Sequence, residues 1–333
     1  PAPRDSVRSR GLGDVYKRPA WVSPLGGMPL GDTNAAAMAT LFGDWFDPEA
    51  SLDYPVGGSA AVVDALVQGL KRHGGTLRTQ ARVEQILLED GRAIGVRLED
   101  GESIHADQLV SNADIWNTLD LLPDGVASAW RHDRAGTPAC HGFRHLHLGC
   151  DASGRDELPI HTVWVDDWQR GIAAERNAVV LSVPSVLDPG MAPQGRHVLH
   201  GYTPASEPWD LWRGVERGSA AYNALKQERC GVFWSVLERK IPDIRDRCEL
   251  VMEGTPLTHR HYLNVHQGSY GPALSATGGL FPGVTTPIDA LWLCGASTFP
   301  GIGIPPVAAS GALAAHGIVG RQAQRSLLKE LGL

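Results

Sequence analysis

The clearest hydrophobic pattern in the chain has the period of an α-helix. Apolar residues recur at the i, i+3, i+4, i+7 spacing that lines one face of a packed helix: Val63, Leu66, Val67 and Leu70. Ser59 is a favoured residue type at helix starts, so we expect it to cap this helix. Gly74 and Gly75 should end it, because glycine adopts the left-handed conformation after a helix at the lowest cost.

The next stretch changes to the two-residue period of strands. Ile94, Val96 and Leu98 alternate with other residues, as expected of a half-buried strand. Asp-Gly pairs at 90–91 and 100–101 are typical of tight hairpin turns. The pattern therefore predicts a small antiparallel meander with strands over 77–89, 93–99 and 102–111.

The middle of the chain, about 114–285, has a mixed pattern. Short apolar runs lie among loops that contain proline and glycine, and a long helix is expected over about 220–241. This mixture predicts a sheet with helices, in a second domain inserted into the first. We expect its strands at 143–149, 161–166, 179–183 and 197–202.

The C-terminal part has the pattern of a strand, a glycine-rich turn and a helix. The apolar run 291–294 is followed by Gly295, Gly301 and Gly303, and then by a helix that starts at Pro305 and runs to about residue 322. Glycines let a backbone approach a cofactor closely, and a helix N-terminus favours anionic groups. Tight packing of strand on helix is the alternative explanation for the same glycines.

Composition narrows the class of protein. The chain has 333 residues, 43% of them hydrophobic and 20% charged, which is an ordinary globular composition. Its net charge of −7 disfavours nucleic-acid binding. Five scattered cysteines without a C-x-x-C pair disfavour a disulfide scaffold and fit a reducing compartment. The most apolar run, 301–320, is interrupted by prolines and polar residues, so we expect a buried helix there rather than a membrane span.

Candidate chemistry among the side chains is sparse. His145 and His147 share one face of an expected strand, and His259 and His261 would do so if extended. Metal binding needs a further converging ligand, and the spacing nominates none, so we expect no metal site. The ten tryptophans indicate either packing or an apolar substrate tunnel. No catalytic side chain is identified. Four acidic residues of the middle part are expected at the surface: Asp166, Asp167, Asp188 and Glu207.

Two ordered sets of motifs occur along the chain. The first set is Tyr54-Pro-Val-Gly-Gly-Ser59, the strand with Val83, Val110-Ser-Asn-Ala113 and Cys294-Gly-Ala-Ser-Thr-Phe-Pro-Gly-Ile-Gly303. The second set is Leu146-His-Leu-Gly149, Asp167-Trp-Gln-Arg-Gly171, Pro184-Ser-Val-Leu-Asp-Pro189, Gly254-Thr-Pro-Leu-Thr258 and Gly268-Ser-Tyr-Gly-Pro272. The first set resembles landmarks of the FAD-dependent phytoene desaturase family, and the second resembles those of its carotenoid (prolycopene) isomerase-like branch. The resemblance covers about residues 21–323.

The resemblance implies an α/β fold of two domains. The FAD-binding domain would be Rossmann-like, of the glutathione-reductase type and discontinuous, lacking its first βαβ unit and with its glycine fingerprint absent here. An α+β substrate domain would be inserted in it. The expected parts are a leader foreign to the fold (1–19), the end of a first substrate-domain segment (20–53), FAD-domain segments (54–113 and 286–323), the substrate domain (114–285) and a tail (324–333).

The resemblance also implies which residues contact FAD. The backbone at Val83 would support the adenine, and the glycine-rich turn would face the ribityl chain, the pyrophosphate and the isoalloxazine. The family often has an Asp where this chain has Ala296, and alanine cannot accept the corresponding hydrogen bond. The cofactor-binding set is Val83, Gly295, Ala296, Ser297, Thr298, Gly301, Gly303, Ile304 and Pro305.

The implied activity is cis-to-trans isomerisation of a carotenoid, a prolycopene-like polyene, with FAD in its reduced form and NAD(P) as a candidate electron source. Such a substrate implies peripheral contact with a membrane, in a plastid or a photosynthetic bacterium. We expect the chain as given, as the C-terminal portion of a longer enzyme, to be inactive and to bind FAD poorly. The alternatives are a carotenoid or phytoene desaturase, a retinoid saturase, and a non-catalytic lipid- or prenyl-protein-binding protein.

Overall fold

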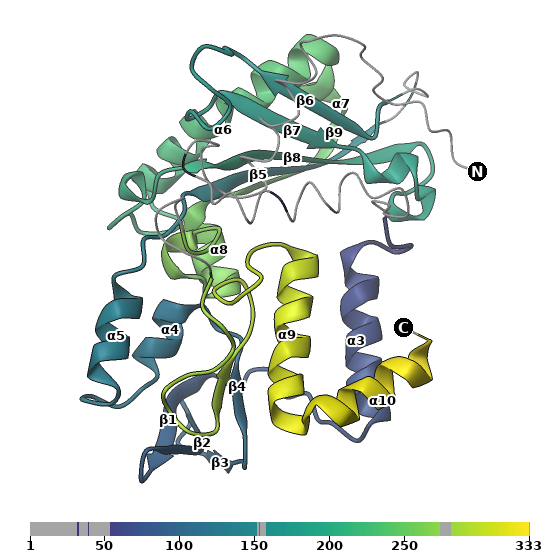
Figure 1. The fold of residues 1–333 in the computed structure, drawn as a ribbon. Helices are drawn as coiled ribbons and strands as arrows, with labels where there is room; N and C mark the ends of the chain where they lie inside the picture. Colours follow the sequence, from purple (N-terminus) through teal and green to yellow (C-terminus); the bar gives the residue numbers. More distant parts are fainter. Residues whose placement is uncertain are drawn as a thin grey trace.

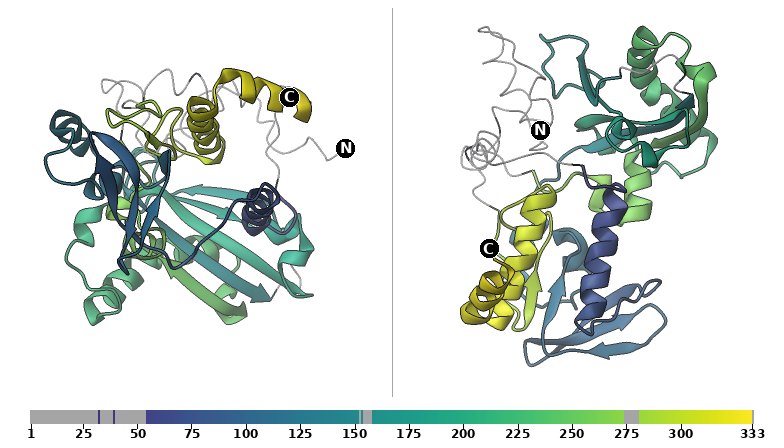
Figure 2. Two further views of the ribbon diagram at one scale, coloured as in Figure 1. Left: turned by 90° about the horizontal axis from the view of Figure 1, so that it is seen from below. Right: turned by 90° about the vertical axis from the view of Figure 1, so that its right-hand side faces the viewer.

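The computed structural model describes residues 54–151, 158–273 and 281–332, together with the single residues 32, 39 and 153. The expected leader, and the segment 20–53 apart from residues 32 and 39, lie outside this described part. Figure 1 shows a five-stranded sheet with helix α6 on one side of it. Helices α3 and α9 and a group of shorter strands lie on the other side, and Figure 2 shows the same arrangement from two further directions.

The large sheet is antiparallel, with strand order β6-β7-β8-β5-β9. Side chains alternate along its interior strand β5, so that Leu146, Leu148 and Cys150 are buried on one face while Phe143 and His145 lie on the other. The five strands are β5 (Gly142–Asp151), β6 (His161–Val165), β7 (Ala178–Ser182), β8 (Arg196–Glu207) and β9 (Cys248–Gly254). The four strands expected from the sequence are confirmed, and β9 is an addition.

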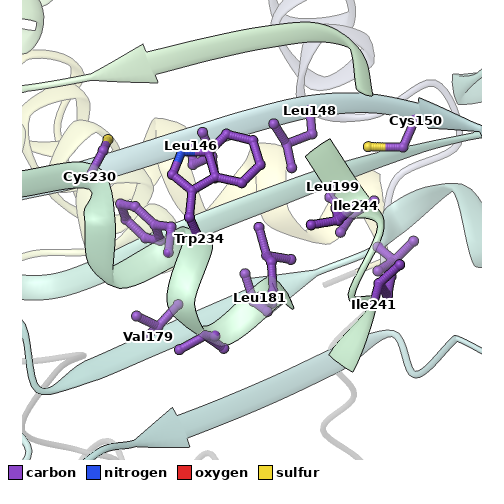
Figure 3. Close-up of a cluster of buried hydrophobic side chains, with 14 residues drawn as sticks. Leu146, Leu148, Cys150, Val179, Leu181, Leu199, Cys230, Trp234, Ile241 and Ile244 are labelled. Carbon is purple, nitrogen blue, oxygen red and sulfur yellow. The ribbon is translucent and has the colours of Figure 1, made fainter. Parts of the chain in front are cut away.

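Helix α6 (Ala220–Lys240) covers the apolar face of this sheet. It begins where the Ser219 side chain accepts a hydrogen bond from the Tyr222 amide. Phe233 and Leu237 of the helix are buried against the sheet, and the short helix α7 (Ile244–Arg247) extends the same core. Figure 3 shows how the side chains of strands and helix meet in this cluster. The helix expected over 220–241 is therefore confirmed.

The remaining strands form two small sheets. β1 (Val83–Glu89), β2 (Arg92–Leu98) and β3 (Ser103–His105) make an antiparallel meander, whereas β4 (Leu109–Ser111) pairs in parallel with β10 (Leu291–Leu293). A second core contains buried side chains from these strands and from helix α4 (Ile115–Asp120), with α5 (Ser128–Ala135) next in the chain. It includes Ile86, Ile115, Leu119, Leu291 and Leu293.

Several boundaries differ from the expectations. The meander begins at Val83 rather than residue 77, and the third expected strand is divided, because residues 109–111 pair with β10 instead of β2. Gly58, with a φ of 73°, precedes α3 (Ser59–Arg72), so Ser59 is its first residue and not its cap. In the described structure no residue of α3 is buried, although its apolar stripe had predicted packing.

The C-terminal helix is also divided. α9 (Ile304–Val319) ends at Gly320, whose φ of 84° favours glycine, and α10 (Arg321–Leu331) follows it. Helix α8 (Pro256–Leu263) was not expected. Among the described helices, none is both long and apolar enough to cross a membrane. The short 3-10 turns are η2 (Pro184–Val186), η3 (Pro189–Met191), η4 (Trp209–Leu211) and η5 (His266–Gly268).

Candidate functional site

The candidate site forms where the parallel strands β4 and β10 end. Carboxyl ends of parallel strands meet at the same edge, and the Cys294 amide there donates to the Ser111 carbonyl at 3.0 Å. The chain after β10 makes the turn 295–303, and the chain after β4 leads into α4. Ser297 joins the two, since its hydroxyl accepts a buried hydrogen bond from the Ile115 amide at 3.1 Å.

Two of the glycines in the turn are required by packing. Gly295 has a φ of 97°, and a Cβ on it would lie 2.4 Å from the Asn112 side-chain oxygen. Its amide donates to the Ser310 hydroxyl at 2.8 Å, which attaches the turn to α9. A Cβ on Gly301 would lie 2.8 Å from the Phe281 ring. Tight packing, the alternative weighed from the sequence, therefore explains both positions.

Gly303 lies in different surroundings. Its φ of 112° favours glycine, but an added Cβ would make only an ordinary contact, 3.6 Å from Pro306. Gly303 immediately precedes α9, and no side chain caps this end of the helix. The side chain of the next residue, Ile304, is 76% exposed. The backbone at the start of α9 is therefore approachable, and the positive end of the helix dipole lies there.

Thr298 is fully buried within the turn, yet its hydroxyl has no hydrogen-bond partner among the described residues. Buried hydroxyl groups are nearly always paired, because an unpaired polar atom loses its hydrogen bonds to water without compensation. Ala296, two residues earlier, has no side-chain acceptor, and a Cβ on Gly271 would lie 3.8 Å from its methyl group. Thr298 thus provides an unused hydrogen-bonding group at this turn.

A row of aromatic rings leads from the turn to the large sheet. A Cβ on Gly271 would lie 3.0 Å from Ile302 of the turn, and the preceding residue, Tyr270, meets Phe143 of β5 edge to face with ring centroids 4.4 Å apart. Phe143 in turn lies 5.9 Å from Tyr202 of β8. These rings occupy the face of the sheet opposite the α6 core, and all are partly exposed. The result is a largely apolar surface that adjoins the glycine-rich turn.

Histidines continue this surface along the sheet. Nδ1 of His145 and Nε2 of His200 are 2.7 Å apart, and His147 stacks on His200 with ring centroids 4.4 Å apart. Burial lowers the pKa of His145 to about 2 and that of His200 to about 4, so both rings are neutral at physiological pH. His200 was not expected beside these histidines, because no local spacing in the sequence relates it to β5.

The other histidine pair does not lie on a strand. His259 and His261 belong to helix α8, so they do not share a strand face. His259 instead packs edge-on against His145, with ring centroids 4.9 Å apart. Burial lowers the pKa of His259 as well. Four imidazoles therefore lie close together around His145.

The burial of individual side chains tests the expectations for the tryptophans and for Glu207. Trp212 and Trp234 are buried, which supports packing rather than a tunnel for these two rings. Glu207 was expected at the surface, but this is wrong, because it is buried and paired with Arg229 at 2.7 Å. Trp212 also donates to Glu207 at 2.9 Å. The Glu207 carboxylate is thus engaged in a buried structural ion pair.

Two surface hollows, of about 560 and 580 Å³, are lined largely by residues of α6. Trp234 and Arg245 line one, and Arg170 and Arg229 line the other. Neither is lined by residues of the glycine-rich turn or by the ring-bearing face of the sheet. We therefore place the candidate site at the turn, where the orphaned hydroxyl and the approachable backbone are found.

Comparison with known proteins identifies the family. Residues 20–319 match the model of the flavin containing amine oxidoreductase family. The chain belongs to this family. A solved structure of a putrescine oxidase bound to putrescine shares the fold, with a TM-score of 0.58 at 13% identity, covering 96% of this chain and 66% of that one. The α/β flavoprotein fold expected from the sequence is confirmed.

Within this family, the chain is similar to curated enzymes that are named for carotenoid substrates. It is 36% identical over 276 residues to the chloroplastic prolycopene isomerase of Daucus carota, covering 80% of this chain and 44% of that protein. It is 27% identical over 310 residues to the neurosporene-forming phytoene desaturase of Rhodobacter capsulatus, covering 88% and 57%. The chain spans about half the length of the curated relatives it matches.

The turn fits a flavin of this family in part. Thr298 offers a hydroxyl without a partner in the described part of the chain, and the start of α9 offers the amides of Gly303 and Ile304 and a favourable dipole for phosphate or ribityl oxygens. Ser297 is already engaged by the Ile115 amide, and Ala296 contributes no polar atom. Val83 lies at the start of β1, beside an irregularity in its pairing with β2. Its share in the same site stays a prediction.

Proposed function

We propose that the protein containing this chain is a flavin-dependent enzyme that isomerises cis double bonds in a carotenoid-like polyene. The observation that carries the proposal is the glycine-rich turn, with its buried unpaired Thr298 hydroxyl, next to a surface of aromatic rings. Similarity to prolycopene isomerases supports the isomerase chemistry. A bound reduced FAD, with NAD(P) as a candidate electron source, supplies transient electron density that lowers the bond order of a conjugated double bond.

The residues of the turn would hold the cofactor in distinct ways. At the start of α9, the amides of Gly303 and Ile304 would donate to oxygens of the pyrophosphate or ribityl chain, and Pro305, which has no N–H, would fix the backbone of the first turn. Thr298 would donate or accept one hydrogen bond. Gly295, Ser297 and Gly301 would maintain the shape of the turn. At Ala296, where the family often has an Asp, backbone or water would accept the hydrogen bond from the cofactor. Backbone atoms of Val83 would support the adenine.

The ring-bearing face of the sheet would receive the substrate. Phe143, Tyr202 and Tyr270 offer apolar area to a conjugated hydrocarbon, and their contacts connect β5 and β8 to the turn. Rigid rings can orient an extended polyene and exclude water from it without specific hydrogen bonds. This division of roles leaves the electronic chemistry to the cofactor and the positioning to the protein.

The test is a comparison of products. The protein that contains this chain is incubated with reduced FAD and either a poly-cis lycopene or phytoene, without light, and the pigments are separated by chromatography. We expect all-trans lycopene from the first substrate and no change in the second. New double bonds in phytoene without isomerisation would instead favour a desaturase, an alternative supported by the similarity to phytoene desaturases. Protein purified without flavin, and unable to bind it, would contradict both.

A hydrophobic substrate also implies contact with a membrane surface, in a plastid or a photosynthetic bacterium. The edge strand β9 exposes Leu250, Val251 and Met252, each about half accessible to solvent. Such an apolar edge is suited to shallow contact with lipid. Co-sedimentation with liposomes checks this part of the proposal, and unchanged co-sedimentation after Val251→Lys would count against β9.

A further inference from the structure

Three imidazoles converge on the face of the sheet opposite α6. His145 and His147 alternate along β5 and so point to the same side. His200 lies on the neighbouring antiparallel strand β8, directly opposite His147 in the pairing register. Two strands of a rigid sheet therefore place three potential ligands side by side. Sheet hydrogen bonds hold their backbones, so only side-chain rotation changes the spacing.

The distances between the ring nitrogens suit a single ion. One nitrogen from each of His145, His147 and His200 lies within 4.8 Å of the others. A zinc ion with bonds of about 2.0–2.1 Å holds two ligand nitrogens roughly 3.4 Å apart in tetrahedral geometry. Turning the rings about their side-chain bonds covers this difference. Opening the hydrogen bond between His145 and His200 would free both nitrogens for the ion.

We propose that His145, His147 and His200 form a binding site for one divalent transition-metal ion of the zinc class. Imidazole is a preferred ligand for Zn²⁺, Co²⁺, Ni²⁺ and Cu²⁺, whereas Mg²⁺ and Ca²⁺ prefer oxygen. Three protein ligands leave a fourth position open to water or to another small ligand. The site is distinct from the flavin turn and does not depend on the proposed function.

The surroundings both support the ligands and admit the ion. His259 of α8 packs edge-on against His145 and makes a hydrogen bond with the Gly268 backbone, which holds its ring in place. Groups behind the ligands that restrict their rotation increase metal affinity. His147 is exposed, so an ion can enter from solvent without passing through a core. The open position then faces the same side as the aromatic surface.

The experiment uses the full chain without a histidine tag, stripped with a chelator and dialysed. Co²⁺ is titrated as a spectroscopic probe, and Zn²⁺ is titrated by calorimetry and counted by elemental analysis. We expect one ion per chain, visible d–d bands from four- or five-coordinate Co²⁺, and a higher melting temperature with Zn²⁺. Removing a ligand through His147→Ala or His200→Ala should weaken binding by at least about tenfold to a hundredfold.

Two features keep the test decisive. His147 is exposed, so His147→Ala should fold even if a change at the more buried His200 does not. His197→Ala is a matched control on β8, since the His197 ring is bonded to Ser185 instead of the cluster. The proposal is overturned if the wild-type chain binds no stoichiometric ion, or if His147→Ala binds Co²⁺ and Zn²⁺ as tightly as the control.

Discussion

At the scale of single residues, Thr298 and Thr118 show how similar side chains differ in role. Both are fully buried. The Thr118 hydroxyl lies 2.8 Å from the Ser111 hydroxyl, whereas the Thr298 hydroxyl has no partner among the described residues. A buried hydroxyl without a partner lowers stability, so its presence indicates a use other than folding.

Replacing Thr298 by valine should separate these roles. Valine keeps the shape of threonine, so Thr298→Val should leave the free energy of unfolding unchanged or raised. It should weaken FAD binding by roughly 2- to 12-fold, the equivalent of one lost hydrogen bond of about 0.5–1.5 kcal/mol. Urea unfolding and a fluorescence-quenching titration with FAD measure the two effects on the protein that contains this chain.

Thr118→Val is the matched control. It should lower the unfolding free energy by about 1–3 kcal/mol, because its buried partners lose a hydrogen bond, and should leave flavin affinity unaltered. If Thr298→Val destabilised the protein as Thr118→Val does, with FAD affinity unaltered, the assignment of Thr298 to the cofactor would be wrong.

At the scale of elements, α9 is placed against β10 by a close contact. A Cβ on Gly317 would lie 2.3 Å from the ring of Trp292, so the helix approaches the strand only because this residue is glycine. The Trp292 ring is itself held by a hydrogen bond of 2.7 Å to the Gln108 side chain. This contact places the last turns of α9 against β10.

Two alanine substitutions in α9 test the dependence. Gly317→Ala should lower the unfolding free energy by about 1–3 kcal/mol through overpacking. Gly311→Ala, in the same helix, would place its methyl group where no atom lies within 4 Å, and should raise stability by about 0.5–1 kcal/mol. Chemical denaturation of both variants gives the comparison; equal effects would mean that the Trp292 contact does not set the position of the helix.

At the scale of the whole molecule, the buried histidines make stability depend on pH. In the unfolded chain a histidine takes up a proton below pH ~6.5. In the folded protein the pKa of His200 is about 4 and that of His145 about 2, so the folded state stays unprotonated over that range. The unfolded state therefore binds more protons, and the free energy of unfolding falls as pH falls below ~6.5.

The expected slope is at most about 1.4 kcal/mol per pH unit for each such histidine. Melting temperatures measured between pH 7 and 5 in the presence of a chelator should therefore fall, and His145→Gln should make the fall less steep. His105→Gln, on strand β3, serves as the control and should retain the full slope. A wild-type melting temperature that is constant over this range would contradict the buried, neutral cluster.

Local patterns were sufficient for most elements of the fold. The period of apolar residues predicted α3, the Asp-Gly pairs predicted the turns of the meander, and a long helix was expected where α6 lies. These features depend on neighbours within a few residues, so the sequence records them directly. Ordered motifs added the family and the FAD-domain fold, which the family match confirms.

The tertiary structure decided which residues meet. Residues 109–111 joined β10 rather than the meander, because parallel pairing brings together strands that are far apart in the chain. The same holds for His200 beside His147, and for the Ser297 hydroxyl at the start of α4. Strand register and burial arise from contacts across the whole fold, so the chain itself determined its elements and family, and only their packing determined the sites.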